Sequence, residues 1–209
     1  IPFGINVASG IFQREMEKVL AGIPGVVVFL DDVLLGSETS EQHWDLLDSV
    51  CRRLQEAGLR VREKKCLFFQ DQVEYLGHHI SAHGVRANGS KVKAILAVPE
   101  PQTVAELKSF LGLISYYSRF VPDRANVLGP LYDLLHKDAE WQWGQRERDS
   151  FNKVKAMLAS NTLLVHYDSA KQLVLTCDAS SVGVGAVLSQ VDDVGREMPI
   201  AFASRRLSQ

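Results

Sequence analysis

Cysteines and long apolar runs are scarce in this sequence. Its 209 residues contain 3 cysteines, Cys51, Cys66 and Cys177, which lie far apart and form no CxxC pair. Three scattered cysteines support neither a disulfide framework nor a zinc knuckle, so we expect reduced, intracellular thiols. No run approaches the roughly 18 consecutive apolar residues of a membrane span, and we therefore expect no membrane partner.

A basic excess is also missing. Lysine and arginine number 23 against 25 aspartates and glutamates, and the formal net charge is -2. This balance argues against a protein that coats polyanions unspecifically, so any contact with nucleic acid must come from a local patch. The best such patch is 60–65, where Arg60, Arg62, Lys64 and Lys65 crowd together. A charge run of this kind is more often a solvated edge than a binding site.

Apolar residues are plentiful, at 46% of the chain, which is ample for a packed core. The densest run is VVVFLDDVLLG at 26–36, in which two carboxylates interrupt β-branched and other apolar residues. Such residues favour strands, so the run predicts two strands that meet at Asp31 and Asp32.

The acidic pair predicts a metal site. Carboxylates flanked on both sides by core-forming residues are costly to keep ionised unless a partner neutralises them. Mg²⁺ or Mn²⁺ suits carboxylate and phosphate oxygens, and pairs of such ions support phosphoryl transfer. Because side chains alternate along a strand, Asp31 and Asp32 are expected on opposite sides of the ribbon, with different tasks. Taken alone, an Asp-Asp pair is also typical of a solvated turn.

Periodicity predicts the other elements, with a change from period two to period three or four near Gly84. Helices are expected at 9–22 (capped by Ser9), 40–58, 90–98, 103–120, 125–136 and 145–159. Further strands are expected at 66–69, 73–80, 163–166, 172–177, 183–189 and 200–203. The acidic turn at 191–197 is interpreted as a plain turn, because it lacks an apolar flank on its C-terminal side.

Seven segments carry a resemblance to a known family. They are IPFG at 1–4, IFQREMEKVL at 11–20, GVVVFLDDVLL at 25–35, VEYLGHHIS at 73–81, LKSFLGLISYYSRFV at 107–121, WQWG at 141–144 and LTCDASSVGVGAVLSQ at 175–190. In this order and spacing they resemble the reverse transcriptase and ribonuclease H region of Ty3/gypsy-type retrotransposon Pol polyproteins. The resemblance covers essentially the whole chain.

The resemblance implies an α+β fold in three parts. Residues 1–83 would form the C-terminal part of a reverse transcriptase palm, with the acidic hairpin and the primer grip. Residues 84–140 would form a helical thumb. Residues 141–209 would form a connection and the N-terminal part of a ribonuclease H-like α/β domain.

The resemblance also implies roles around the acidic hairpin. Asp31 would be the principal catalytic metal ligand and Asp32 the secondary one, for Mg²⁺ or Mn²⁺. The backbone of Phe3 and Gly4 would lie against the incoming nucleotide, and Gln13 would help position the template strand. Position 29 is Phe where the family usually has Tyr, which keeps the ring near the nucleotide but removes its hydroxyl.

Two further sites follow from the same resemblance. Tyr75, Leu76 and Gly77 would belong to the primer grip, in which Gly77 lets the sugar-phosphate backbone approach and Tyr75 braces the strand. A plain core hairpin is the alternative for this segment. Asp178 would bind the catalytic metals of ribonuclease H, and a cap at the end of a strand is the alternative for it.

The implied partners are an RNA/DNA primer-template, deoxynucleotides and the rest of the Pol polyprotein, in a cytoplasmic particle or the nucleus. In the family one polymerase carboxylate precedes the PFG turn and further ribonuclease H acids follow position 209. Catalytic carboxylates act as a unit, so we expect the isolated chain to be inactive or nearly so. The alternative is a decayed or domesticated remnant that binds nucleic acid or protein without catalysis.

Overall fold

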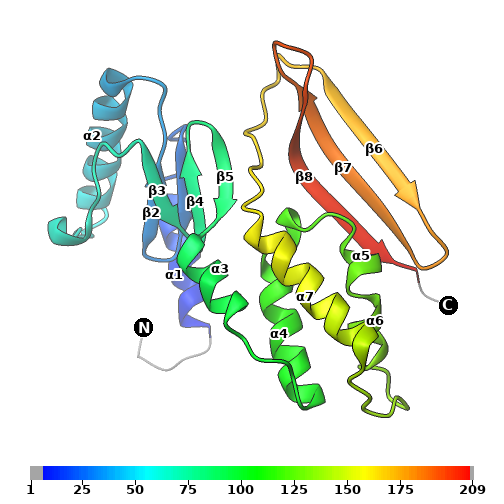
Figure 1. The fold of residues 1–209 in the computed structure, drawn as a ribbon. Helices are drawn as coiled ribbons and strands as arrows, with labels where there is room; N and C mark the ends of the chain where they lie inside the picture. The colour runs from blue at the N-terminus through cyan, green and yellow to red at the C-terminus, as the bar shows by residue number, and fades with distance from the viewer. Residues whose placement is uncertain (1–6, 208–209) are drawn as a thin grey trace. The chain divides into compact units, whose positions relative to one another are not determined.

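The computed structural model describes residues 7–207 and divides the chain into two compact units, Ile1–Asp71 and Gln72–Gln209 (Figure 1). The first unit holds α1 (Ala8–Val19), β1 (Val26–Phe29), β2 (Asp32–Leu35), α2 (Ser40–Glu56) and the 3₁₀-helix Glu63–Lys65. The two strands form an antiparallel hairpin, as predicted, with Val26 opposite Leu35 and Phe29 opposite Asp32.

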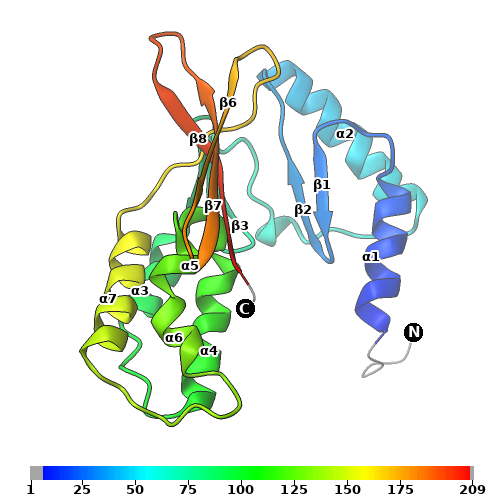
Figure 2. The ribbon, with the colours of Figure 1, turned by 90° about the vertical axis from the view of Figure 1, so that its right-hand side faces the viewer.

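Helices α1 and α2 cover one face of this hairpin. Figure 2 shows both helices beside β1 and β2. The core they share consists of Met16, Leu20, Leu46, Val50 and Leu54, packed against Val19, Ile23, Val26, Val28, Val33, Leu35 and Leu59. On the opposite face, the side chains of Val27 and Phe29 are 55% and 49% exposed. The alternation along β1 is that of a strand with one buried face.

Two details of the first unit, the cap of α1 and the segment 66–69, differ from the sequence predictions. Ser9 lies inside α1, where Val7 occupies the cap position without a side-chain hydrogen bond. Helix α2 begins at Ser40, as predicted, and is capped by Thr39, whose side chain accepts from the Gln42 amide at 3.2 Å. The strand expected at 66–69 is wrong, because this segment has no strand partner and Phe69 instead packs its ring 4.6 Å from Trp44 of α2.

The second unit begins with a three-stranded antiparallel sheet and continues with helices. Its strands are β3 (Gln72–Tyr75), β4 (His78–Ser81) and β5 (Gly84–Ala87). Its helices are α3 (Gly89–Leu96), α4 (Val104–Tyr116), the 3₁₀-helix Ser118–Phe120, α5 (Arg124–Val127), α6 (Gly129–Asp133) and α7 (Gln145–Ala159). The segment 73–80, expected as one strand, is a hairpin because a tight turn at Leu76 and Gly77 reverses the chain.

The helix boundaries follow local chemistry. The side chain of Thr103, the cap of α4, accepts from the Glu106 amide at 3.2 Å, which is one half of a capping box. The Glu106 carboxylate accepts from the Gln102 amide at 2.8 Å, one residue before the cap. The single helix expected at 125–136 is wrong, since α5 ends before Leu128 and α6 starts at Gly129. Pro130 explains the break, because proline has no amide hydrogen for a continuous helix and its ring is tolerated only in a first turn.

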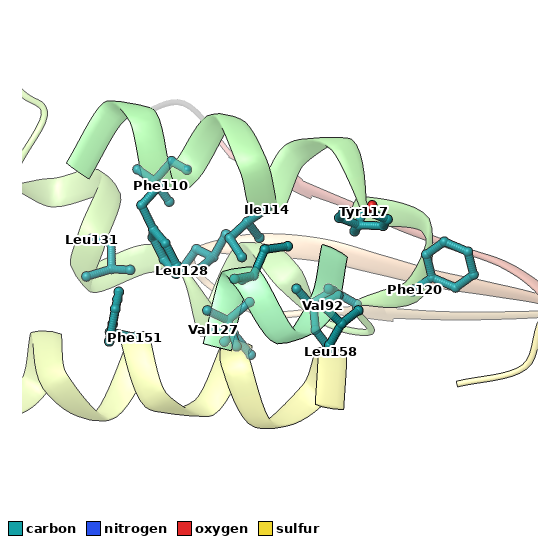
Figure 3. Packing of buried hydrophobic residues seen from close by; sticks show 14 of the residues in the cluster. Val92, Phe110, Ile114, Tyr117, Phe120, Val127, Leu128, Leu131, Phe151 and Leu158 are labelled. Atoms are coloured by element: carbon teal, nitrogen blue, oxygen red, sulfur yellow. The ribbon is translucent and has the colours of Figure 1, made fainter. Parts of the chain in front are cut away.

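The helices of the second unit enclose one large core. Figure 3 shows Phe110 and Ile114 of α4 pointing toward Phe151 of α7, with Leu128 and Leu131 between them. The rings of Phe110 and Phe151 are 4.5 Å apart, and Ile114, Leu128 and Leu131 have no exposed surface. Burial of this apolar area is the main source of stability for the unit.

A second antiparallel sheet completes this unit. It consists of β6 (Leu173–Ala179), β7 (Gly183–Val191) and β8 (Glu197–Arg206), in that order. The strand expected at 163–166 is only an isolated bridge between Val85 and Leu164. In Figure 1, β6 forms the outer edge of this sheet, and its side chains are mostly exposed.

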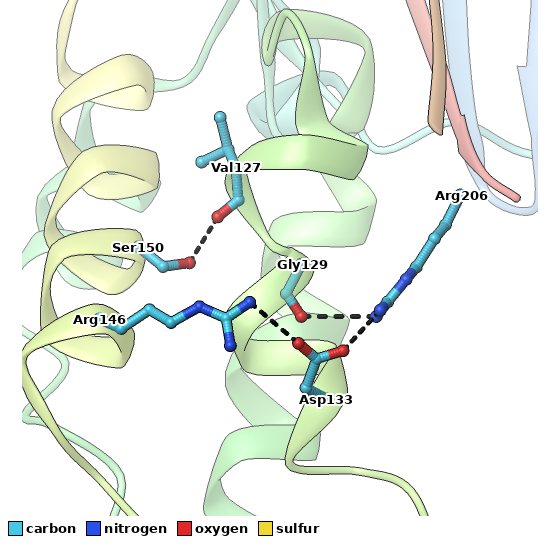
Figure 4. A network of polar contacts seen from close by, with 6 residues as sticks. All are labelled: Val127, Gly129, Asp133, Arg146, Ser150 and Arg206. Carbon is cyan, nitrogen blue, oxygen red and sulfur yellow. Dashed lines mark hydrogen bonds and ion pairs between the residues drawn. The ribbon is translucent and has the colours of Figure 1, made fainter. Parts of the chain in front are cut away.

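Polar contacts tie β8 to the helices. Figure 4 shows the Asp133 carboxylate between Arg146 of α7 and Arg206 of β8. Its oxygens lie 3.2 Å from Arg146 Nη2 and 2.5 Å from Arg206 Nη2. The Ala125 amide donates to the Ser204 hydroxyl at 2.8 Å, close to this network in sequence. Within residues 7–207, no helix has the length and apolar character needed to cross a bilayer.

Candidate active site

The acidic pair lies at the tip of the first hairpin. Leu30 and Asp31 connect the two strands, and Asp32 is the first residue of β2. Because Asp32 pairs with Phe29, its side chain lies on the same face of the ribbon as the exposed Phe29 ring, away from the α1 and α2 core. Both carboxylates are exposed.

This exposure corrects the electrostatic part of the sequence argument. We expected Asp31 and Asp32 to be enclosed by apolar strands, so that only a cation would make their charge tolerable. The carboxylates instead lie where water reaches them, because one face of the hairpin is open. Burial therefore does not demand a metal ion here, and the ligand role of both residues stays a prediction.

Gln13 of α1 holds the turn that carries these carboxylates. Its side-chain Oε1 accepts from the Leu30 amide at 2.5 Å, and its Nε2 donates to the Val28 carbonyl at 3.1 Å. Leu30 has φ +54°, a left-handed conformation that costs an L-residue about 1 kcal/mol or more. Gln13 thus supports a strained turn, and its expected contact with the template stays a prediction.

The described residues supply only some of the ligands that a metal site at this tip would need. Asp31 and Asp32 are two hard oxygen donors of the kind that Mg²⁺ and Mn²⁺ prefer. No group of three or more His, Cys, Asp or Glu side chains able to hold a metal ion occurs within residues 7–207. Phe3 and Gly4, expected beside the nucleotide, lie outside the described residues.

The second candidate site is the turn between β3 and β4. Tyr75 pairs with His78, so Leu76 and Gly77 form a two-residue turn, with φ +46° and +71°. Positive φ at both positions is typical of a type I′ hairpin turn. The Leu76 and Gly77 carbonyls accept hydrogen bonds from the hydroxyls of Tyr116 and Tyr117, respectively.

His78 lies beneath this turn among aromatic rings. Its ring centroid is 5.6 Å from Tyr116, 5.9 Å from Tyr117 and 5.6 Å from Phe120. Burial lowers the pKa of His78, while its hydrogen bond to the Leu76 carbonyl opposes the change and the charge of Arg119 adds to it. The imidazole is therefore held in its neutral form at neutral pH.

Asp178 lies on β6, opposite Gly185 of β7, and is exposed. Its Oδ1 accepts from the amide of Ala179 at 2.9 Å, a local bond that leaves the carboxylate facing solvent. The acidic turn at 191–197 differs from it, as expected. Asp192 there accepts from the Arg196 amide at 2.8 Å, and this bond and those from Val194 and the Arg196 side chain lower its pKa.

Sequence reasoning missed the two tyrosine hydroxyls that bind the β3–β4 turn. Tyr116 and Tyr117 lie within the helix expected at 103–120, for which the sequence predicts no contact with this turn. Their partners are 40 residues away in the chain. Helical periodicity describes which face a residue occupies but not which distant carbonyl its hydroxyl reaches.

Two protein families match the chain. Residues 1–80 match the reverse transcriptase (RNA-dependent DNA polymerase) family. Residues 143–209 match an RNase H-like domain found in reverse transcriptase. The acidic hairpin and the β3–β4 turn fall in the first match, and Asp178 falls in the second.

Curated relatives match the whole chain. The retrovirus-related Pol polyprotein from transposon opus of Drosophila melanogaster is 39% identical over 222 residues, which covers 100% of this chain and 22% of that protein. The transposon Tf2-3 polyprotein of Schizosaccharomyces pombe is 34% identical over 211 residues, covering 100% of this chain and 16% of that protein. The chain thus spans about a fifth of the length of such relatives.

Solved structures agree with these matches. The foamy viral protease-reverse transcriptase in complex with dsDNA superposes with a TM-score of 0.84 at 28% identity, over 100% of this chain and 44% of that one. The same enzyme in complex with an RNA/DNA hybrid gives a TM-score of 0.83 at 28% identity, over 100% of this chain and 28% of that one.

Proposed function

Since this chain belongs to the reverse transcriptase and RNase H region of Ty3/gypsy-type retrotransposon Pol polyproteins, we propose that it contributes palm, thumb and RNase H-like parts to an RNA-directed DNA polymerase. The observation that carries this proposal is the order of two matches, reverse transcriptase at 1–80 and the RNase H-like domain at 143–209, within one chain. The whole polyprotein, of which the chain is a part, would be the active species.

The proposed reaction is nucleotidyl transfer. The primer 3′-hydroxyl attacks the α-phosphate of a deoxynucleotide, the new phosphodiester bond forms and pyrophosphate leaves. Enzymes of these families generally use divalent metal ions, which lower the charge on the phosphates and favour ionisation of the attacking hydroxyl. Asp31 would be the principal residue that holds Mg²⁺ or Mn²⁺ and Asp32 the secondary one, with further oxygen donors from nucleotide phosphates and other parts of the polyprotein.

The geometry of the hairpin tip supports these roles. Its carboxylates are accessible to a large polymeric substrate, because the tip is exposed. Phe29 presents its ring on the same face as Asp32, where it would contact the incoming nucleotide. Gln13, bound to the Leu30 amide, would keep the tip in place and so position the acids.

Two other regions complete the proposal. The turn formed by Leu76 and Gly77, together with Tyr75, would contact the primer strand. Asp178 would hold divalent ions for hydrolysis of the RNA strand of a hybrid. An RNA/DNA primer-template is therefore the proposed partner, and the exposed position of Asp178 on an edge strand leaves room for it.

The decisive experiment uses the complete polyprotein, an RNA template with a DNA primer, deoxynucleotides and Mg²⁺. We expect Asp31→Asn to abolish primer extension while leaving the thermal unfolding temperature unchanged. Asp193→Asn is the matched control, because Asp193 also belongs to a pair of adjacent aspartates at a hairpin turn and is likewise exposed. Normal extension by Asp31→Asn would remove Asp31 from the mechanism.

A second variant of the same polyprotein distinguishes the two proposed activities. Asp178→Asn should abolish cleavage of the RNA strand in an RNA/DNA hybrid and leave primer extension intact. Equal loss of both activities would indicate a structural role for Asp178. Primer-template binding by the wild type without either activity would favour the non-catalytic remnant.

A further inference from the structure

The turn between β3 and β4 has an unfavourable residue at its first position. Leu76 has φ +46°, where asparagine or glycine is normally found in a type I′ turn. Left-handed conformation costs a residue such as leucine about 1 kcal/mol or more. Something outside the turn must therefore stabilise it.

Four groups surround the two carbonyls of the turn. Leu76 O accepts from the Tyr116 hydroxyl and lies 2.7 Å from His78 Nδ1. Gly77 O accepts from the Tyr117 hydroxyl at 3.2 Å and from the Asn88 amide at 3.0 Å. Since a carbonyl oxygen offers two lone pairs, both oxygens are fully used.

The protonation of His78 follows from these contacts. A carbonyl only accepts hydrogen bonds, so Nδ1 must carry the proton that is shared with Leu76 O. The other ring nitrogen, Nε2, is buried and has no hydrogen-bond partner among residues 7–207. A neutral Nδ1–H tautomer satisfies both observations.

The turn and the helix are also in van der Waals contact. A Cβ atom added to Gly77 would lie 3.0 Å from the Tyr117 hydroxyl oxygen and 3.3 Å from Tyr116 Cε1. No L-side chain fits that space without movement of a ring, and φ +71° disfavours one in any case. Gly77 is thus required by the two tyrosines and not only by the turn.

We propose that Tyr116 and Tyr117 are positioning residues that latch the Leu76–Gly77 turn to the end of α4, so that the turn and this helix move as one body. The latch consists of the two hydroxyls, the two turn carbonyls and His78. Its value for the reaction rests on the proposed function, in which this turn holds the primer strand. Direct hydrogen bonds would then couple α4, the proposed thumb helix, to the turn that contacts the primer.

Tyr116 distinguishes a latch from ordinary packing. Tyr117 is 5% exposed and belongs to the core, so its burial alone would justify it. Tyr116 is 53% exposed and lies outside the buried core, yet its hydroxyl reaches Leu76 O. Apolar burial does not explain that hydroxyl, whereas a positioning role does.

The first test is structural and uses the 209-residue chain labelled with ¹³C and ¹⁵N. Tyr116→Phe keeps the ring and removes one donor, so we expect the Leu76 carbonyl ¹³C resonance to shift and the His78 Nδ1–H signal to broaden or move. Tyr117→Phe should shift the Gly77 carbonyl instead. Tyr167→Phe is the control, because Tyr167 is 60% exposed and its hydroxyl makes no hydrogen bond within residues 7–207.

The second test uses the complete polyprotein in steady-state primer extension. Loss of one hydrogen bond corresponds to up to about a tenfold change in an equilibrium constant. We expect Tyr116→Phe to raise the KM for primer-template by a few fold up to about tenfold, with the KM for deoxynucleotide unchanged. A merely structural role would leave the two KM values in their original ratio.

The outcomes separate the latch from the proposed function. Unchanged Leu76 and Gly77 carbonyl resonances in both variants would overturn the latch. Shifted resonances with unchanged primer-template KM would support the latch and reject the primer contact. Shifted resonances with a raised primer-template KM would support both.

Discussion

The side chain of Gln13 hydrogen-bonds the backbone of Leu30, 17 residues away, at the tip of the acidic hairpin. The same amide group binds Val28 O, so one side chain of α1 holds β1 and its turn together. The β3–β4 turn repeats this arrangement with other residues. There too a leucine of positive φ begins a two-residue turn, and a helix side chain, that of Tyr116, binds its backbone.

Gln13→Ala should destabilise the acidic hairpin. It removes two hydrogen bonds to partly buried backbone groups, and we expect the free energy of unfolding to fall by about 1–2 kcal/mol in urea titration. Gln55→Ala of α2 is the control, because its exposed side chain makes no hydrogen bond within residues 7–207. Equal stability of both variants would show that the Gln13 contacts do not hold the turn.

Gly77→Ala and Gly112→Ala should have opposite effects. At Gly77 the methyl group meets two tyrosines at positive φ, so we expect a loss of about 1–2 kcal/mol. Gly112 lies within α4 with no atom within 4 Å of an added Cβ, and alanine should stabilise the helix by up to about 1 kcal/mol. Thermal melts of both variants measure this, and a stabilised Gly77→Ala would refute the close packing.

His78 should make stability depend on pH. Its folded pKa lies below the usual value of 6.5, so protons bind the unfolded chain more tightly. Its contribution is therefore complete above pH 6.5 and is lost as the pH falls from there toward the folded pKa, below which no further loss occurs. The groups facing it are Arg119, Tyr116 and Tyr117.

Melting temperatures between pH 5 and pH 8 test this dependence. His78→Gln should reduce the fall in melting temperature as the pH drops below 6.5. The exposed His83 provides the matched control, and His83→Gln should leave the dependence of the melting temperature on pH unchanged. A wild-type profile that is flat below pH 6.5 would contradict the lowered pKa.

Asp133→Asn should loosen β8 from the helices. The substitution removes the charge that attracts both Arg146 and Arg206. The carboxylate is about one-third exposed (34%), so solvent screening limits the expected loss to about 1 kcal/mol. Thermal unfolding with Asp138→Asn as an exposed control measures it, and high salt should reduce the difference between the two variants.

Much of the fold follows from local patterns. The β-branched and apolar runs at 26–36 predict the first hairpin, and the helix expected at 103–120 agrees with the start of α4. Predictions failed where a tertiary partner decides the outcome. Residues 66–69 have strand-forming composition but no strand beside them, and Leu164 pairs at a single bridge. A strand exists only if another strand accepts its hydrogen bonds.

The candidate site, too, could be predicted from the sequence only in part. The order of motifs identifies Asp31, Asp32, Asp178 and the turn at Leu76 and Gly77 as sites to test. The exposure of the two acids and the tyrosine hydroxyls on the turn carbonyls were not visible in the sequence. Water access depends on which face of the hairpin is covered, and α1 and α2 cover only one.

The amino-acid sequence by itself determined the family, the order of the parts and the residue types available for chemistry, because these depend on composition and spacing along the chain. Only the tertiary structure decided that the acids are solvated and that Gln13, Tyr116 and Tyr117 hold the two turns. Those contacts join residues 17 and 40 positions apart, and chain folding alone brings such donors and acceptors within hydrogen-bonding distance.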